Sequence, residues 1–268
     1  MYKRYYDIDV DAKAYANRIV KAGGRIPSDI GSVSDFIKKL KINNLWNSMI
    51  CWPLRSIHNA GSGVKAYSLG NIGTYDATLI NGPVWRQDGI LYDGVDDYIL
   101  TTYGANVDWA NGMSLFTCFN TLGWSISRGS FATVLSNMMA APPYPTVTIL
   151  GGGGVNSSIR VDTNTATTEY YQYSTSITNY SYNMLGFTHN NQIRNAILNN
   201  STYSSISIPT KLGTSTNNFN FGRSAEYGRY ANISQAFVVI FTRGLTSAES
   251  STFYSIYKTT IGKGLNLP

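Results

Sequence analysis

Short runs of alternating apolar and polar residues, each bounded by Gly, Asn, Asp or Pro, fill most of the chain after residue 51. Such runs are typical of strands with one buried face, and their spacing favours an antiparallel sandwich over a parallel α/β fold. Gln235–Phe241 is apolar on both faces, which predicts a central strand. The predicted strands are 89–92, 97–101, 113–119, 131–136, 146–150, 157–162, 168–173, 182–189, 192–198, 205–209, 218–222 and 233–242. The sequence therefore predicts a mainly β, two-layer antiparallel fold.

The first fifty residues follow a helical pattern instead. Apolar residues recur at helical spacing from Asp11 to Gly23, and again from Ile30 to Met49. Two helices this short cannot bury their apolar stripes alone. They must pack on the following domain, on a neighbouring subunit or on a larger assembly. We expect residues 1–50 to form a two-helix N-terminal arm and residues 51–268 to form the sandwich.

The end of the chain predicts one more short helix. Thr246 and Glu249 have the spacing of a capping box, ahead of apolar residues such as Phe253 and Tyr257. We expect this helix to end near Gly262.

Charge and hydropathy narrow the function classes. The formal net charge is +6, but the basic residues are mostly scattered singly, so the charge does not indicate nucleic-acid binding. No apolar run is long enough to span a membrane. The start of the chain has no apolar run behind its basic residues, so we expect no signal peptide and folding in a cytoplasm.

The two cysteines, Cys51 and Cys118, lie far apart and lack metal-ligand spacing. Both sit in apolar runs. We expect them to be small apolar fillers of core strands.

Three segments, in this order, resemble the laminin-G-like or concanavalin A-like jelly-roll family. The first is Ile90–Ile99, with its Asp-Gly-Val-Asp-Asp-Tyr run. The second joins Asn183–Thr188 and Ala196–Asn200, and the third joins Ile233–Ile240, Thr242–Thr246 and Glu249. The resemblance implies a jelly-roll sandwich over roughly residues 67 to 260. Asn200 replaces the turn glycine usual in the family, and because Asn tolerates positive φ we expect the turn to survive.

The N-terminal segment resembles the arms that precede such domains in phage virion proteins, through Asp11–Tyr15 and Leu45–Trp46. This resemblance implies a structural protein of a phage particle: a capsid decoration, minor capsid or fibre subunit. We then expect a protein made in the host cytoplasm and located in the virion. It would be a homo-oligomer that contacts other virion proteins through residues 1–50.

The sequence does not predict an enzyme or a cofactor. Glu169, Glu226 and Glu249 are the only glutamates, and none has an acidic partner at the spacing of glycosidase carboxylates on this fold. His58 and His189 lack a nucleophile elbow, so we interpret both as structural. Gly151–Gly154 lacks the Lys and Ser or Thr of a phosphate-binding loop.

Two groups remain as candidate binding residues. Asp93, Asp96 and Asp97 could hold calcium, but the favoured interpretation is a tight turn shaped by their side chains, with no metal.

Tyr227, Arg229 and Tyr230 could bind a glycan, although tyrosines also serve strand and subunit packing. They support the alternative function, a carbohydrate-binding lectin-like module or adhesin that recognises host surface polysaccharide.

Overall fold

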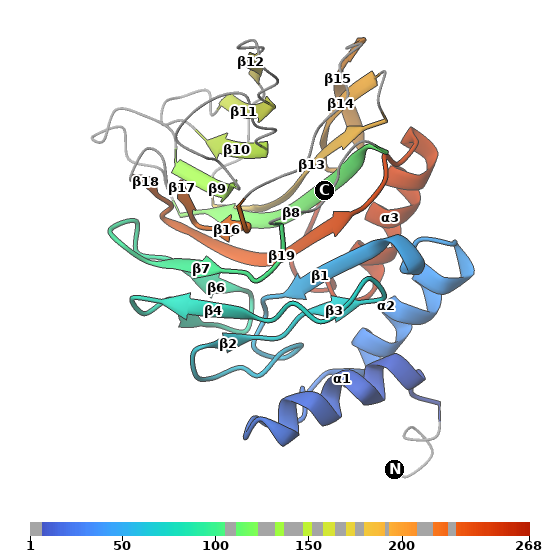
Figure 1. Cartoon of the computed structure of the whole chain (residues 1–268), viewed down its shortest axis with the longest axis vertical. Coiled ribbons are helices and arrows are strands. Elements are labelled where there is room, and N and C mark those ends of the chain that lie inside the picture. The colour runs from blue at the N-terminus through green and yellow to red at the C-terminus, as the bar shows by residue number, and fades with distance from the viewer. Residues whose placement is uncertain are drawn as a thin grey trace.

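The protein is a sandwich of two antiparallel sheets with helices on one side (Figure 1). The computed structural model describes residues 7–104, 111–122, 132–136, 147–151, 158–163, 170–174, 180–190, 193–207, 217–224 and 229–268. The predicted two-layer antiparallel architecture is confirmed.

Within the described residues, the two sheets have nine and eight strands. The first sheet has the order β15-β14-β13-β8-β19-β1-β3, with β6 pairing with β19 and β5 pairing with β6. Its strands are β1 (Met49–Pro53), β3 (Leu69–Gly70), β5 (Val84–Trp85), β6 (Ile90–Leu91), β8 (Met113–Thr121), β13 (Tyr182–His189), β14 (Ile193–Leu198), β15 (Ser201–Ser207) and β19 (Ile233–Phe241).

The second sheet has eight strands, in the order β12-β11-β10-β9-β16-β7-β4-β2. Its strands are β2 (Lys65–Ala66), β4 (Ala77–Ile80), β7 (Tyr98–Leu100), β9 (Ala132–Ser136), β10 (Val147–Gly151), β11 (Ser158–Thr163), β12 (Tyr170–Ser174) and β16 (Asn220–Phe221). A separate small hairpin joins β17 (Arg223–Ser224) and β18 (Arg229–Tyr230).

Strand β19 is central, as its apolar sequence predicts. All nine of its residues are buried, and it pairs with β8 on one side and β1 on the other. One face contributes residues such as Val238 and Ile240 to the core between the sheets. The other face contributes Phe237, Val239 and Phe241 to a second core against the helices. The strand is apolar throughout because both of its faces are covered.

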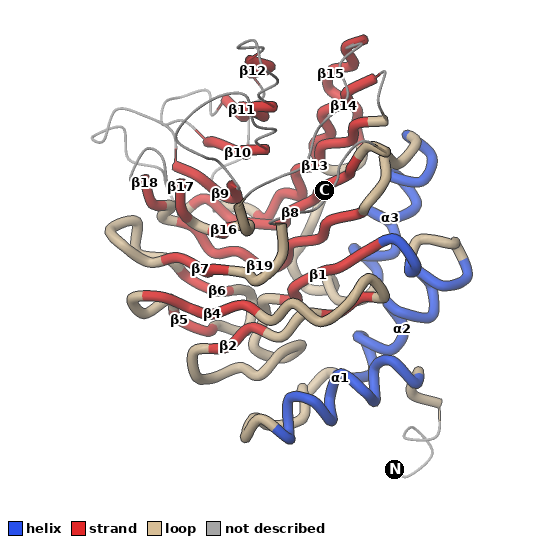
Figure 2. The backbone as a smooth tube through the Cα atoms, viewed as in Figure 1, coloured by secondary structure: helices blue, strands red, loops and turns tan. Residues whose placement is uncertain are grey.

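Helices α1 (Val10–Lys21), α2 (Ile30–Ile42) and α3 (Ser247–Thr259) cover the outer face of the first sheet (Figure 2). Phe36 of α2 meets Phe237 of β19 with ring centroids 5.8 Å apart, and Phe253 of α3 lies 6.2 Å from the same ring. The apolar stripes of the two N-terminal helices pack on the sandwich that follows them, which is one of the three partners that the sequence allowed. A separate anchoring role for residues 1–50 stays a prediction.

The second helix is shorter than its apolar period predicts. It ends at Ile42, and Asn44 adopts a φ of 57° while Leu45 N–H donates to the Leu40 carbonyl at 2.9 Å. This left-handed residue ends the helix, since Asn tolerates that conformation. A short 3-10 turn, η1 (Trp46–Ser48), then leads into β1, so the apolar residues up to Met49 continue the core without continuing the helix.

The turn after β14 differs from expectation in detail. The positive φ, 54°, falls on Asn199 instead of Asn200. The Asn199 side-chain oxygen accepts from Met184 N–H at 2.9 Å, which holds the turn against β13.

The capping box of α3 is confirmed. Thr246 Oγ1 accepts from Glu249 N–H at 3.2 Å, and Glu249 Oε2 accepts from Thr246 N–H at 2.9 Å. The helix ends at Thr259, three residues before Gly262. Cys51 and Cys118 are buried and free, as expected of core fillers. Among the described residues, none of the helices has the length and apolar character that a membrane crossing needs.

Candidate functional site

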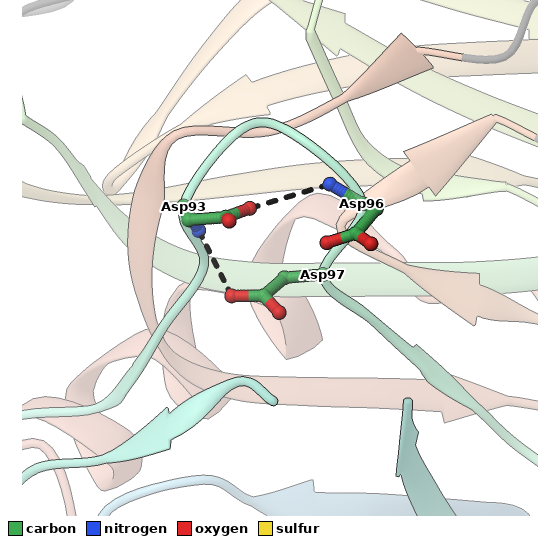
Figure 3. Close-up of side chains that lie close together, drawn as sticks. All are labelled: Asp93, Asp96 and Asp97. Carbon is green, nitrogen blue, oxygen red and sulfur yellow. Dashed lines mark hydrogen bonds between the residues drawn. The ribbon is translucent and has the colours of Figure 1, made fainter. Parts of the chain in front are cut away.

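Three carboxylates gather in the turn between β6 and β7, which we call the acidic turn (Asp93–Asp97). Ligand oxygens of Asp93, Asp96 and Asp97 all lie within 4.8 Å of one another (Figure 3). Asp93 Oδ1 accepts from Val95 N–H at 2.7 Å and from Asp96 N–H at 3.3 Å, while Asp97 Oδ2 accepts from Asp93 N–H at 3.1 Å. Gly94, with a φ of 78°, allows the tight reversal. The side chains shape the turn, as the sequence predicts.

The acidic turn offers negative charge at the surface. Asp97 is buried, and burial raises the pKa of its carboxyl group, an effect to which the charges of Asp93 and Asp96 add and which the Asp93 N–H opposes. Asp93 and Asp96 are exposed. Hard oxygen ligands of this kind suit calcium, and calcium binding stays the less favoured hypothesis beside the predicted turn without a metal. Equal melting temperatures with and without a chelator would contradict it.

The acidic turn does not resemble a glycosidase centre. Retaining glycosidases place two carboxylates about 5 Å apart on either side of the bond that they break. Here the three carboxylates belong to one turn and face one another (Figure 3). The carboxylates of Asp93 and Asp97 already accept hydrogen bonds from the backbone of the turn.

A cluster of two tyrosines and an arginine lies next to the acidic turn. Tyr98 of β7 directly follows Asp97, and its ring centroid is 6.4 Å from that of Tyr230 in β18. The Arg223 guanidinium carbon lies 4.6 Å from the Tyr98 ring centroid and 5.7 Å from that of Tyr230. We call Tyr98, Arg223 and Tyr230 the Tyr–Arg–Tyr cluster. Both rings and the cation are half-buried.

Strand pairing and one glycine bring the cluster together. β16 pairs with β7 so that Phe221 lies opposite Ile99, which carries the chain past Tyr98. Gly222 has a φ of 78°, and a Cβ there would lie 2.7 Å from the Tyr92 ring, so the position requires glycine. The bend at Gly222 starts β17, where Arg223 pairs with Tyr230. β7, β17 and β18 lie at the same end of the sandwich (Figure 1).

The Arg223 side chain has an unusual environment. Its Nε atom is buried without a hydrogen-bond acceptor. Within the described part of the chain, no carboxylate forms an ion pair with it, and the two tyrosine rings are its contacts. Among the described residues, the interactions of this positive charge are therefore those with the two aromatic faces.

The predicted glycan-binding residues are only partly placed. Tyr230 belongs to the Tyr–Arg–Tyr cluster, while Tyr227 lies outside the described residues. Arg229 is in β18 opposite Ser224, but its side chain is not among those described. The sequence analysis missed Tyr98 and Arg223. Tyr98 was used only as part of a strand motif, and nothing near Arg223 in the sequence links it to Tyr98.

The two histidines lie in buried contacts. His58 Nε2 is 3.2 Å from Asp29 Oδ2, and the hydrogen bond from His58 lowers the pKa of Asp29 to about 2. His189 Nδ1 accepts from Arg194 Nε at 3.3 Å, and burial lowers the pKa of His189 to about 4, with a smaller effect of the Arg194 charge. These contacts agree with a structural interpretation of both residues.

The three glutamates are only partly described. Glu249 serves the cap of α3 and pairs with Arg243 at 2.7 Å. Glu169 and Glu226, like Gly152, Gly153 and Gly154 of the glycine run, lie outside the described residues.

Comparison with known proteins gives a fold but no family. No family model and no curated protein matches the sequence. A solved structure of the botulinum neurotoxin serotype D ligand binding domain in complex with N-acetylneuraminic acid is similar, with 11% identity and a TM-score of 0.56 over 78% of this chain and 50% of that chain. The fold is concanavalin A-like. A mutant of Trypanosoma rangeli sialidase displaying trans-sialidase activity also matches, with 12% identity and a TM-score of 0.55 over 89% of this chain and 40% of that chain.

The similarity concerns architecture alone. The chain spans about half the length, or less, of these proteins, and so low an identity carries no residue roles across. The quoted structures come from a toxin and a sialidase, and they give no support to a phage origin.

Proposed function

We propose that this chain is a non-enzymatic carbohydrate-binding module whose ligand lies on the Tyr–Arg–Tyr cluster beside the acidic turn. The observation that carries the proposal is the half-buried pair of rings formed by Tyr98 and Tyr230, with the Arg223 cation over both rings and the acidic turn directly before Tyr98 in the chain. Aromatic faces stack against the apolar faces of sugar rings, and charged groups bind the hydroxyls.

The comparisons support this proposal over a purely structural role. A protein of the same fold is a ligand binding domain in complex with N-acetylneuraminic acid, and another is a sialidase. A shared fold does not fix function, so the site residues must carry the test.

The absence of catalysis and of a cofactor is part of the proposal. Glu249 is already engaged by the helix cap, and the carboxylates of the acidic turn serve its backbone. Neither group is arranged to attack or protonate a glycosidic bond. Release of reducing sugar from a bound glycan would overturn this part.

A glycan array with purified protein tests the binding function. We expect the wild type to bind at least one glycan, and Tyr98→Ala and Tyr230→Ala each to weaken that signal at least about tenfold, because each removes one stacking face. Tyr180→Ala is the matched control, since Tyr180 is 73% exposed and outside the cluster. Absence of wild-type binding to any glycan, or equal loss in all three variants, would overturn the proposal.

A role in a phage particle, with a virion location and homo-oligomeric assembly through residues 1–50, stays a prediction from the sequence. One argument for this role was that the apolar stripes of α1 and α2 need a partner. That argument is weaker, because both stripes are buried on the first sheet. Size-exclusion chromatography with light scattering gives the oligomeric state. A monomer would contradict the assembly, while an adhesin on a particle would fit both functions.

A further inference from the structure

We propose that Arg223 makes the Tyr–Arg–Tyr cluster selective for sugars that carry a single carboxylate, such as uronic or sialic acids. This inference rests on the proposed carbohydrate-binding function and names its ligand class. The observation behind it is a guanidinium that lies over two aromatic rings and whose Nε has no acceptor among the described residues.

Other arginines of the protein show what a satisfied guanidinium looks like here. Arg55 donates to the carbonyl oxygens of Gln87, Ile261 and Lys263 at 2.8 to 3.0 Å. Arg243 pairs with Glu249 at 2.7 Å. Arg223 has neither kind of partner in the part of the chain that the structure describes. A buried donor left without an acceptor costs about 1–3 kcal/mol, and functional sites are where such a cost is retained.

The cluster holds the cation in a way that suits a planar anion. Tyr98 and Tyr230 contact the guanidinium through their faces, at 4.6 and 5.7 Å, which restrains its plane. The edge of a guanidinium in this setting presents parallel N–H groups that match the two oxygens of a carboxylate. A lysine would supply the charge without that geometry.

The acidic turn limits how much negative charge the ligand can carry. Asp93 and Asp96 are exposed at the same end of the sandwich, where Gly94 approaches Asn232, two residues after Tyr230, so closely that a Cβ would lie 3.0 Å from the Asn232 Cβ. These carboxylates accept hydrogen bonds from sugar hydroxyls but repel further anionic groups. A sugar with one carboxylate fits both sides of the site, and a polysulfated chain does not.

Calorimetry with matched ligands tests the inference. The first pair is a disaccharide with one glucuronate and its methyl ester, which share all sugar rings and differ at the carboxylate. The second pair is sialyllactose and its methyl ester, and heparin is the polyanionic probe. We expect the wild type to bind the acid of at least one pair at least about tenfold more tightly than its neutral partner, and more tightly than heparin.

Variants assign the preference to Arg223. Arg223→Met should bring the acid down to the affinity of its neutral partner, and Arg223→Lys should restore only part of the difference. Arg25→Met removes one charge from an exposed residue after α1 and should keep the full preference. Thermal melts verify that each variant is folded.

The outcomes separate the two proposals. If the wild type binds none of these probes and no glycan on the array, the carbohydrate-binding function itself fails. If it binds glycans without preferring the acid of either pair, or if Arg223→Met keeps the preference, the function stands and the carboxylate assignment is wrong. Tighter binding of heparin would likewise overturn the assignment, because it would show a general anion site.

Discussion

Two groups of aromatic residues in this protein differ in their burial and in their polar contacts. Phe36, Phe237 and Phe253 are closed between the helices and the first sheet, fully buried and packed edge to face or stacked. Tyr98 and Tyr230 are half-buried, carry hydroxyl groups, and both lie close to the Arg223 cation. The first group has no polar atom to satisfy and serves stability. The second retains polar and charged groups that a ligand can use.

The elements that carry the two groups differ in the same way. Phe237 lies on β19, a nine-residue strand paired on both sides. Arg223 and Tyr230 lie on two-residue strands of a separate hairpin. Long paired strands fix a core, while short segments at a sandwich end tolerate the departures from good packing that binding requires.

The largest loss of stability should come from a change in the buried phenylalanine group. Phe237→Ala removes a ring that contacts Phe36, Phe253 and Tyr257 at centroid distances of 4.7 to 6.2 Å. We expect the free energy of unfolding to fall by about 3–5 kcal/mol, as is typical of a buried Phe. Urea denaturation followed by circular dichroism measures it. A loss below about 1 kcal/mol would mean that the helices do not cover this face in solution.

A smaller loss of stability should appear as the pH decreases, because of the buried His189 of β13. The pKa of His189 is lowered to about 4 when folded, against 6.5 when unfolded. Between these values the unfolded chain binds a proton that the folded protein does not, so stability falls as pH decreases through this window and is constant above it. We expect about 2 kcal/mol of the loss between pH 7.5 and 5.0 to come from His189.

Urea denaturation of the wild type and His189→Gln at both pH values measures this contribution. His58 also has a lowered pKa and adds to the wild-type slope, so the variant should keep a reduced slope. Asp29 titrates lower, near a pKa of 2, and does not interfere. An unchanged slope in His189→Gln would show that His189 is accessible to protonation in the folded state.

A loss of stability of about 1 kcal/mol should follow from removing the N-terminal cap of α3. Thr246→Ala removes the oxygen that accepts from Glu249 N–H at 3.2 Å, and we expect a loss of about 1 kcal/mol. Thr252→Ala, on the same helix but away from the cap, is the control and should change stability by less than about 0.5 kcal/mol. Equal losses in both variants would assign the effect to lost side-chain contacts and not to the cap.

The regions that sequence analysis predicted well are those in which the chain's local pattern and its burial agree. β19 is apolar because both of its faces are covered, and Thr246 and Glu249 form the cap of α3 at the spacing that the sequence shows. The end of α2 was missed because the apolar period runs on to Met49, while the left-handed Asn44 interrupts the backbone. Two-residue strands such as β3 and β5 leave no period to detect.

The candidate site was only partly predictable, for a physical reason. Its tyrosines and arginine meet through the pairing of β16 with β7 and of β17 with β18, which joins segments far apart in the sequence. Tyr230 was identified because it belongs to an aromatic-rich stretch, but Arg223 becomes a candidate only once the fold places it over the Tyr98 ring. Long-range register is not encoded in any single stretch of residues.

The smallest loss of stability should come from a change in the Tyr–Arg–Tyr cluster. This variant tests directly whether the cluster differs from the phenylalanine core. Arg223→Met loses cation–π contacts worth about 0.5–1 kcal/mol each at partly exposed sites. It also removes the buried Nε that has no acceptor, which relieves about 1–3 kcal/mol. These effects oppose each other, so we expect urea denaturation to show a net change between a loss of about 1 kcal/mol and a gain of about 2 kcal/mol. A loss above about 2 kcal/mol would place Arg223 with Phe237 as part of the framework, because a residue that the fold needs so strongly does not require a ligand to explain its presence.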